Sequence, residues 1–184
     1  MDRLATWISR LFGWSLLFLS AFVALETLMR KLFNTSLQGA DELGGYILAF
    51  GASLAFIVAM IDRAHIRIDV LHAKFPVRMQ AAIDWLSVIS LGVLGLFFLH
   101  VGRFVIADTL DYGSTAATPW RTPLIWPQSA WYAGLAVFAL CSFVMAWRAS
   151  RLFLAGRHAE LAAAFNPKSA EDELTEELDQ LQER

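Results

Sequence analysis

The chain has 184 residues, of which 57% are hydrophobic and 17% charged, and its formal net charge is −2. Soluble domains carry about a quarter charged residues, so this composition favours an integral membrane protein. The basic residues do not form a stripe along any segment, so nucleic-acid binding is not predicted. The single cysteine, Cys141, lies in an apolar run and excludes both a disulfide framework and a cysteine metal cluster.

Four long apolar runs without strand-like alternation predict an all-α fold. We expect a bundle of four transmembrane helices within a membrane domain of residues 1–155. The first run is not ended by a small-x-small cleavage site, so we interpret it as an uncleaved span rather than a signal peptide. The expected spans are about 11–33, 43–61, 81–107 and 124–147.

The second apolar run has the clearest boundaries. From Leu43 to Ile61 its only ionisable side chain is the phenol of Tyr46, and these 19 residues would form a helix of roughly 28 Å. That length is close to the hydrocarbon thickness of a bilayer, roughly 30 Å. Asp41 and Glu42 precede the run, and a basic, histidine-bearing segment follows it. The charged groups at its two ends are the features most indicative of function.

Two connections and the C-terminal segment carry further predictions. The loop after the second span is expected to hold a short interfacial helix over 70–75, capped by Asp69 and ended by Pro76. The loop before the fourth span is rich in Gly, Ser, Thr and Pro, and is expected to be irregular. Residues 156–184 are expected to form an acidic cytoplasmic tail, partly helical. A helix from Ser169 would be either a short docking helix or a frayed polar segment.

The basic residues predict the orientation in the membrane. Only four lie on one side of the predicted spans, namely Arg30, Lys31, Arg103 and Arg121. By the positive-inside rule the other side, with ten before the C-terminal Arg184, is cytoplasmic, and it includes both termini. The ten are Arg3, Arg10, Arg63, Arg67, Lys74, Arg78, Arg148, Arg151, Arg157 and Lys168.

Glu26 and Arg30 stand four residues apart on one face of the first span, which suits an ion pair. Acids inside a membrane span are functional candidates, so Glu26 is one hypothesis for a proton-coupled carboxylate. The alternative is a structural pair that braces the outer helix end. Asp84 and Arg103 bracket the third span and are expected to be ordinary boundary charges.

Small residues at four-residue spacing predict close helix packing along the second span. Gly45, Ala49 and Ser53 form this stripe, and Ala52 and Ala59 extend the small-residue surface. Gly51 is a further candidate for helix packing. The stripe can pack against another helix of the same bundle or against a helix of a partner protein.

Enzyme chemistry is not predicted. A membrane haem needs paired axial histidines within the spans, and only His100 lies in one. The sequence also lacks G-x-S-x-G, H-E-x-x-H and glycine-rich phosphate-loop signatures. We therefore expect no catalytic residues, no metal and no cofactor.

The two ends of the second span resemble the small integral-membrane subunit, of DctQ type, of tripartite ATP-independent periplasmic (TRAP) transporters. Gly45 is a departure, because relatives often carry a basic residue before the tyrosine. Glu26 and Arg30, followed by Asn34, also match the family. The resemblance covers roughly residues 1–155. It is carried by Asp41-Glu42-Leu43, Tyr46, Phe50-Gly51-Ala52 and His65-Ile66-Arg67-Ile68-Asp69.

The resemblance implies a complex of three proteins in a bacterial inner membrane. A periplasmic binding protein, in transient contact, would deliver an organic anion, and a large membrane subunit would import it. This chain would brace the large subunit within the lipid bilayer. The resemblance makes eight residues candidate assembly contacts: Glu26, Arg30, Asp41, Glu42, Tyr46, His65, Arg67 and Asp69.

Two other hypotheses remain. The first is an autonomous small proton-coupled exporter with Glu26 as its coupling residue. The second is an anchor that holds a cytoplasmic partner through the acidic tail.

Overall fold

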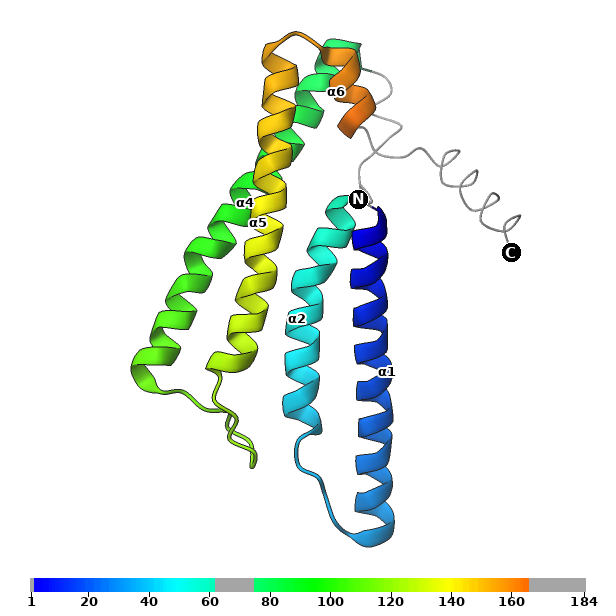
Figure 1. Ribbon diagram of the computed structural model, residues 1–184, viewed down its shortest axis with the longest axis vertical. Helices are drawn as coiled ribbons and strands as arrows, with labels where there is room; N and C mark the ends of the chain where they lie inside the picture. The colour runs from blue at the N-terminus through cyan, green and yellow to red at the C-terminus, as the bar shows by residue number, and fades with distance from the viewer. Residues whose placement is uncertain (1, 62–74, 166–184) are drawn as a thin grey trace, which may run out of the picture. The chain divides into compact units, whose positions relative to one another are not determined.

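The computed structural model describes residues 2–61 and 75–165 (Figure 1). Within these ranges there is no β-strand, and four helices are long and apolar enough to cross a membrane. The predicted all-α class with four spans is thus confirmed. The helices are α1 (Asp2–Phe33), α2 (Ala40–Ile61), α4 (Val77–Tyr112), α5 (Ile125–Leu154) and the short α6 (His158–Phe165).

Other predictions fall outside the described residues. The interfacial helix predicted over 70–75 does so except for Phe75, which is not helical. A tail helix starting at Ser169 would also lie outside. The described part of the tail instead contains α6, which begins eleven residues before Ser169.

Left-handed residues end three of the long helices. Gly113 (φ 57°) follows α4, and the Ser114 amide donates to the carbonyl of Thr109 at 3.1 Å. Gly156 (φ 69°) ends α5 in the same way. Asn34 (φ 53°), a residue type that tolerates this conformation, follows α1. These turns satisfy carbonyls that the helix ends would leave without partners.

The long helices extend beyond the apolar spans. The 36 residues of α4 correspond to about 54 Å of helix, against roughly 30 Å of hydrocarbon. Hydrophobicity marks only the part of a helix that lies in lipid, whereas backbone hydrogen bonding continues into the polar segments that flank it.

The chain divides into two compact units, which are described separately. Unit 1 comprises Met1–Val58 and Gly95–Leu140, and unit 2 comprises Ala59–Leu94 and Cys141–Arg184. In unit 1, α2 packs against α4 and α5 through Phe56, whose ring lies 6.0 Å from that of Phe98 and 5.6 Å from that of Phe138.

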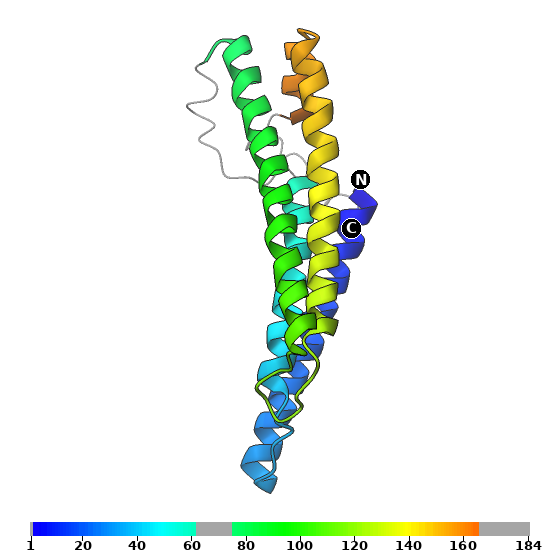
Figure 2. The same ribbon diagram turned by 90° about the vertical axis from the view of Figure 1, so that its left-hand side faces the viewer.

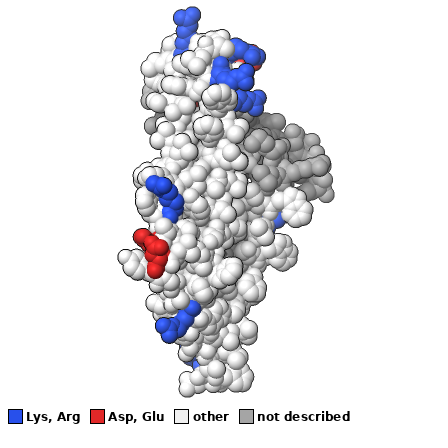
Figure 3. Space-filling view, turned by 60° about the vertical axis from the view of Figure 1, so that its left-hand side comes forward, with Lys and Arg blue, Asp and Glu red and all other residues white. Residues whose placement is uncertain are grey.

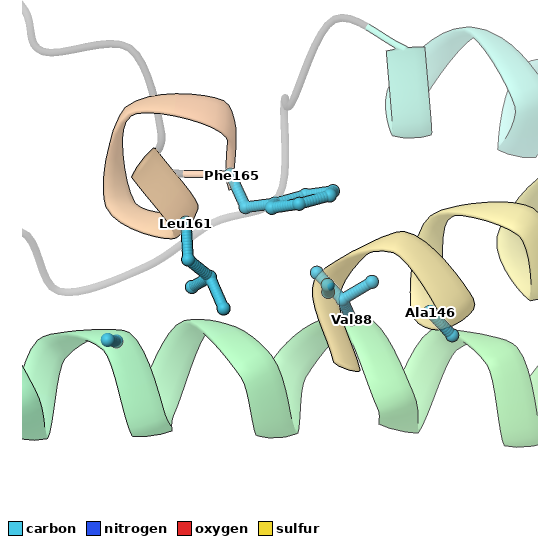
Figure 4. Close-up of a cluster of buried hydrophobic side chains, with 6 residues drawn as sticks. Val88, Ala146, Leu161 and Phe165 are labelled. Atoms are coloured by element: carbon cyan, nitrogen blue, oxygen red, sulfur yellow. The ribbon is translucent and has the colours of Figure 1, made fainter. Parts of the chain in front are cut away.

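Unit 2 has a core built from alanines, larger aliphatic side chains and aromatic rings. Leu161 and Phe165 of α6 point toward α4 and α5, where Val88 and Ala146 lie (Figure 4). Trp85 stacks on Phe153 at 4.9 Å. Alanines let the helices approach closely, so the short α6 can bury its apolar side chains there.

Most of the remaining surface is apolar. On the face shown in Figure 3, uncharged residues predominate and charged side chains form a few small groups. In the most hydropathic window of α1 only 6% of residues are buried, and Leu17, Phe18 and Leu28 are all more than half exposed. Such a surface suits lipid or a membrane partner rather than water.

Candidate functional site

The 34–39 loop of unit 1 is tied to α1 by Glu26. The Glu26 side chain is almost fully buried, and its Oε1 accepts hydrogen bonds from Arg30 (2.7 Å) and from the Ser36 hydroxyl (2.8 Å). The same hydroxyl oxygen accepts from the backbone amide of Gln38 at 3.1 Å. One carboxylate therefore joins the end of α1 to the loop that leads into α2.

A second buried carboxylate, Glu42, ties α2 to the 113–124 loop. The Tyr46 hydroxyl donates to Glu42 Oε1 at 2.8 Å, and the Thr118 hydroxyl donates to Oε2. Thr122 also faces this carboxylate. Buried carboxylates need such donors, so the contacts fix the loop against the first turns of α2.

Trp120, in the 113–124 loop, joins this loop to the 34–39 loop. Figure 2 shows the backbone of the two loops. The indole Nε1 of Trp120 donates to the carbonyl of Leu37 at 3.0 Å, and its ring meets Phe22 edge-on at 6.2 Å. Gly39 provides the space for the ring, because a Cβ there would lie 2.1 Å from Trp120 Cζ2. The ring can reach the loop only because residue 39 has no side chain.

The 113–124 loop is itself ordered by backbone hydrogen bonds. The Ala116 amide donates to Thr122 O (2.9 Å), and the Leu124 amide donates to Ser114 O (3.0 Å). The turn closes through the Arg121 amide and the Thr118 carbonyl, at 3.0 Å. The segment contains no helix or strand, as expected for an irregular connector, but these bonds and an isolated antiparallel bridge between Thr115 and Pro123 close it into a narrow hairpin-like loop. We call the combined contacts the two-loop cluster, made of Glu26, Arg30, Ser36, Leu37, Gly39, Glu42, Tyr46, Thr118, Trp120 and Thr122.

A cavity of about 610 Å³ lies next to this cluster, also within unit 1. The first turns of α2, the 113–124 loop and the start of α5 line it. Asp41 and Glu42 are at the beginning of α2, while Ala49 and Trp131 give the cavity apolar walls. A cavity of this size, mostly apolar with a few polar groups, has the properties of a ligand pocket.

The small residues of α2 have different surroundings. A Cβ on Gly51 would overlap the ring of Phe12, and Ser53, which is fully buried, lies against Gly134 of α5. Gly45 has open space beside it, and like Ala49 it is exposed and lines the cavity. The stripe is thus only partly used for packing inside the chain.

The other predicted contact residues lie apart from the two-loop cluster or outside the described ranges. Asp41 is exposed at the rim of the cavity. His65, Arg67 and Asp69 fall outside the described residues, so their role stays a prediction.

Several residues of the two-loop cluster were missed by sequence reasoning. Thr118, Trp120 and Thr122 lie 76 to 83 positions from their partners near the start of α2, and no local pattern reveals such pairs. A weak signal was present, because Gly39 directly precedes the acidic start of α2 and Trp120 lies in a Thr/Pro-rich loop.

Asp84 was also misjudged, in unit 2. The sequence predicts a boundary charge, yet the side chain is 0% exposed. It shares a helix face with Ala81 and Val88, which belong to the core that α6 covers.

The described residues do not show a metal site. Nowhere in 2–61 or 75–165 do three or more His, Cys, Asp or Glu side chains gather as metal ligands would. The buried carboxylates Glu26 and Glu42 face donors from loops instead.

Comparison with known proteins gives one match. Residues 19–152 match the family described as "Tripartite ATP-independent periplasmic transporters, DctQ component". No curated protein and no solved structure matches the chain. The match includes both carboxylates of the two-loop cluster and the whole 113–124 loop.

Proposed function

We propose that this chain, which belongs to the DctQ family of TRAP transporter components and is a small permease subunit, braces the large membrane subunit. The family is one of membrane transport components rather than of enzymes. The large subunit would import an organic anion that a periplasmic binding protein delivers. The family match over residues 19–152 is the observation that carries this proposal.

The apolar surface of unit 1 supports a bracing role. α1 exposes large side chains such as Leu17 and Phe18 along its length. Helix association in lipid depends on shape and on polar contacts rather than on hydrophobicity alone.

The two-loop cluster would lie on the periplasmic side of the bacterial inner membrane, with both termini in the cytoplasm. The distribution of Lys and Arg supports this orientation. Glu26 with Arg30, and Glu42 with Tyr46, would hold the two outer loops in one shape, and Asp41 would project beside them. A preformed outer surface lowers the entropy that assembly must overcome.

His65, Arg67 and Asp69 would make the corresponding contacts on the cytoplasmic side. This part of the proposal rests on the family resemblance of that segment. Arg67→Ala should then reduce recovery of the complex and leave the 113–124 loop unchanged.

The contacts of Glu26 favour a structural pair over the exporter hypothesis. A coupling carboxylate must gain and lose a proton during each transport cycle. Glu26 is held by Arg30 and by Ser36, two contacts that tie it to the end of α1 and to the 34–39 loop and so suit a structural role.

Co-purification tests the proposal. The tagged chain, expressed with its genomic neighbours and extracted in mild detergent, should retain one large polytopic subunit. Transport in liposomes should require both proteins. Transport by this chain alone, abolished by Glu26→Gln, would reject the proposal and establish the exporter.

Glu42→Ala sharpens this test. It should lower recovery of the large subunit and the transport rate without changing substrate selectivity, because Glu42 orders a surface and does not touch the substrate. Asp111→Ala is the matched control, since Asp111 is an exposed acid of unit 1. A change in selectivity with an intact complex would contradict the assigned role.

A further inference from the structure

We propose that the cavity beside the two-loop cluster is a binding site for one phospholipid with a primary ammonium headgroup. The ammonium group would pair with Asp41, and an acyl chain would extend along Gly45, Ala49 and Trp131. This inference requires only that α2 spans the bilayer. It does not depend on the large subunit.

The polarity of the cavity changes along α2. Asp41 lies in the first turn and Ala49 two turns later, a separation of about 12 Å along the helix axis. The lining includes polar groups of Asp41, at the start of α2, and of Thr115, in the 113–124 loop, and apolar groups of Ala49 and Trp131, which lie further along α2 and α5. A lipid presents the same sequence of polar and apolar parts along the membrane normal. α2 thus places the polar end at the headgroup level and the apolar end at the depth of hydrocarbon.

The charges of the cavity select the headgroup. Its lining contains two carboxylates and no Lys, Arg or His. Glu42 is occupied by Tyr46 and Thr118, whereas Asp41 is exposed and makes no hydrogen bond or ion pair with any side chain in the described ranges. A primary ammonium has three N–H donors, as lysine does, and can donate to such a carboxylate, whereas a trimethylammonium has no N–H donor. An anionic headgroup would be repelled.

The open side of the cavity is accessible to a lipid. Gly45 has nothing within 4 Å of its would-be Cβ, and Ala49 is exposed. The opposite wall is held by the Glu42 contacts and by the hairpin of the 113–124 loop. The site is therefore preformed, so binding would not require ordering of the protein.

The test uses the full chain in mild detergent, with phosphatidylethanolamine, phosphatidylcholine or phosphatidylglycerol added at equal concentration. Bound lipid is counted by native mass spectrometry, and the thermal midpoint is measured in parallel. We expect phosphatidylethanolamine to be retained about fivefold over phosphatidylcholine, the factor that one exposed ion pair can supply. Asp41→Asn should remove this preference, and Ala49→Leu should reduce retention of all three lipids by filling the apolar end.

Ala52→Leu is the control, because Ala52 is exposed on α2 and does not line the cavity. It should leave lipid retention unchanged. Equal retention of the three lipids by the unaltered chain, or a headgroup preference that survives Asp41→Asn, would overturn the proposal. The proposal would also be overturned if the chain alone retained no lipid and Ala49→Leu changed the thermal midpoint only in the presence of the large subunit, because a side chain of that subunit would then fill the cavity. None of these outcomes alters the co-purification result on which the proposed function depends.

Discussion

The two-loop cluster of unit 1 and the helical core of unit 2 are held by different interactions. In the cluster, the buried carboxylates Glu26 and Glu42 accept hydrogen bonds from separate loops, and Trp120 lies over a glycine. In unit 2, Leu161 and Phe165 of α6 pack against alanines and Val88.

The difference determines how each region responds to change. A buried polar contact is costly when one partner is removed, because the other loses its hydrogen bond without regaining water. An apolar core responds to volume, so the size of the void decides the cost. Hydrogen exchange of the 113–124 and 158–165 segments can follow the two regions separately.

The largest expected effect is in unit 2, for Leu161→Ala. Leu161 is 0% exposed, and removing its side chain leaves a cavity under α6. We expect a loss of about 3 kcal/mol and faster exchange across 158–165. Leu154→Ala is the matched control, because Leu154 is 85% exposed. An equal rise in exchange across 113–124 would show that the two regions are not separately stabilised.

The sequence predicted the spans better than the contacts between them. In lipid every backbone hydrogen bond must be satisfied within the segment, so a long apolar run is sufficient to identify a helix. Glu26 and Arg30 were predicted as an ion pair because they lie about one helical turn apart, and the structure has that pair. The contact of Glu42 with Thr118 was missed because it joins residues 76 positions apart.

α6 and Asp84 show the same limit in unit 2. The segment His158–Phe165 is only eight residues long, and its helix depends on a surface formed by α4 and α5. Because the sequence did not predict α6, it gave no reason to expect a core beside Asp84, and this residue was interpreted as a charge at the membrane boundary. Gly156 was the available signal, since glycine commonly follows a helix and a new element can start after it.

The next largest effect is expected in the two-loop cluster, for Gly39→Ala. The added Cβ would overlap the Trp120 ring, and displacing the ring should cost about 2 kcal/mol. Exchange across 113–124 should rise while 158–165 stays unchanged. The thermal midpoint in detergent provides the global measure.

Two variants separate this overlap from a capping effect. Gly39→Ser supplies a good helix cap and should still destabilise, because it also has a Cβ. In a Trp120→Ala background, Gly39→Ala should have little further effect. Gly45→Ala controls for the loss of glycine itself, since nothing lies within 4 Å of its added Cβ. Equal destabilisation by Gly45→Ala would contradict the role of Trp120.

A smaller effect is expected from a polar contact that joins α4 to α5 in unit 2. The Trp85 Nε1 donates to the Ser150 hydroxyl at 3.0 Å. Trp85→Phe removes this bond and keeps an aromatic ring against Phe153, so we expect a loss of about 1 kcal/mol in a denaturation measurement. Trp147→Phe, at an exposed tryptophan, should be neutral. If Trp85→Phe lowered the free energy of unfolding by nearly as much as Leu161→Ala, the hydrogen bond would contribute as much to the stability of unit 2 as its apolar packing does.

The smallest effect is expected for the ion pair between Arg157 and Glu160 at the start of α6. Both side chains are more than half exposed, so water and salt already screen their attraction. Arg157→Ala should therefore change the free energy of unfolding by at most about 0.5 kcal/mol, and the change should vanish at high salt. The measurement is the thermal midpoint at low and high ionic strength, compared with Arg148→Ala, an exposed arginine of α5. A large, salt-independent loss would show that α6 is held by charge, and the contrast with the two-loop cluster would then fail.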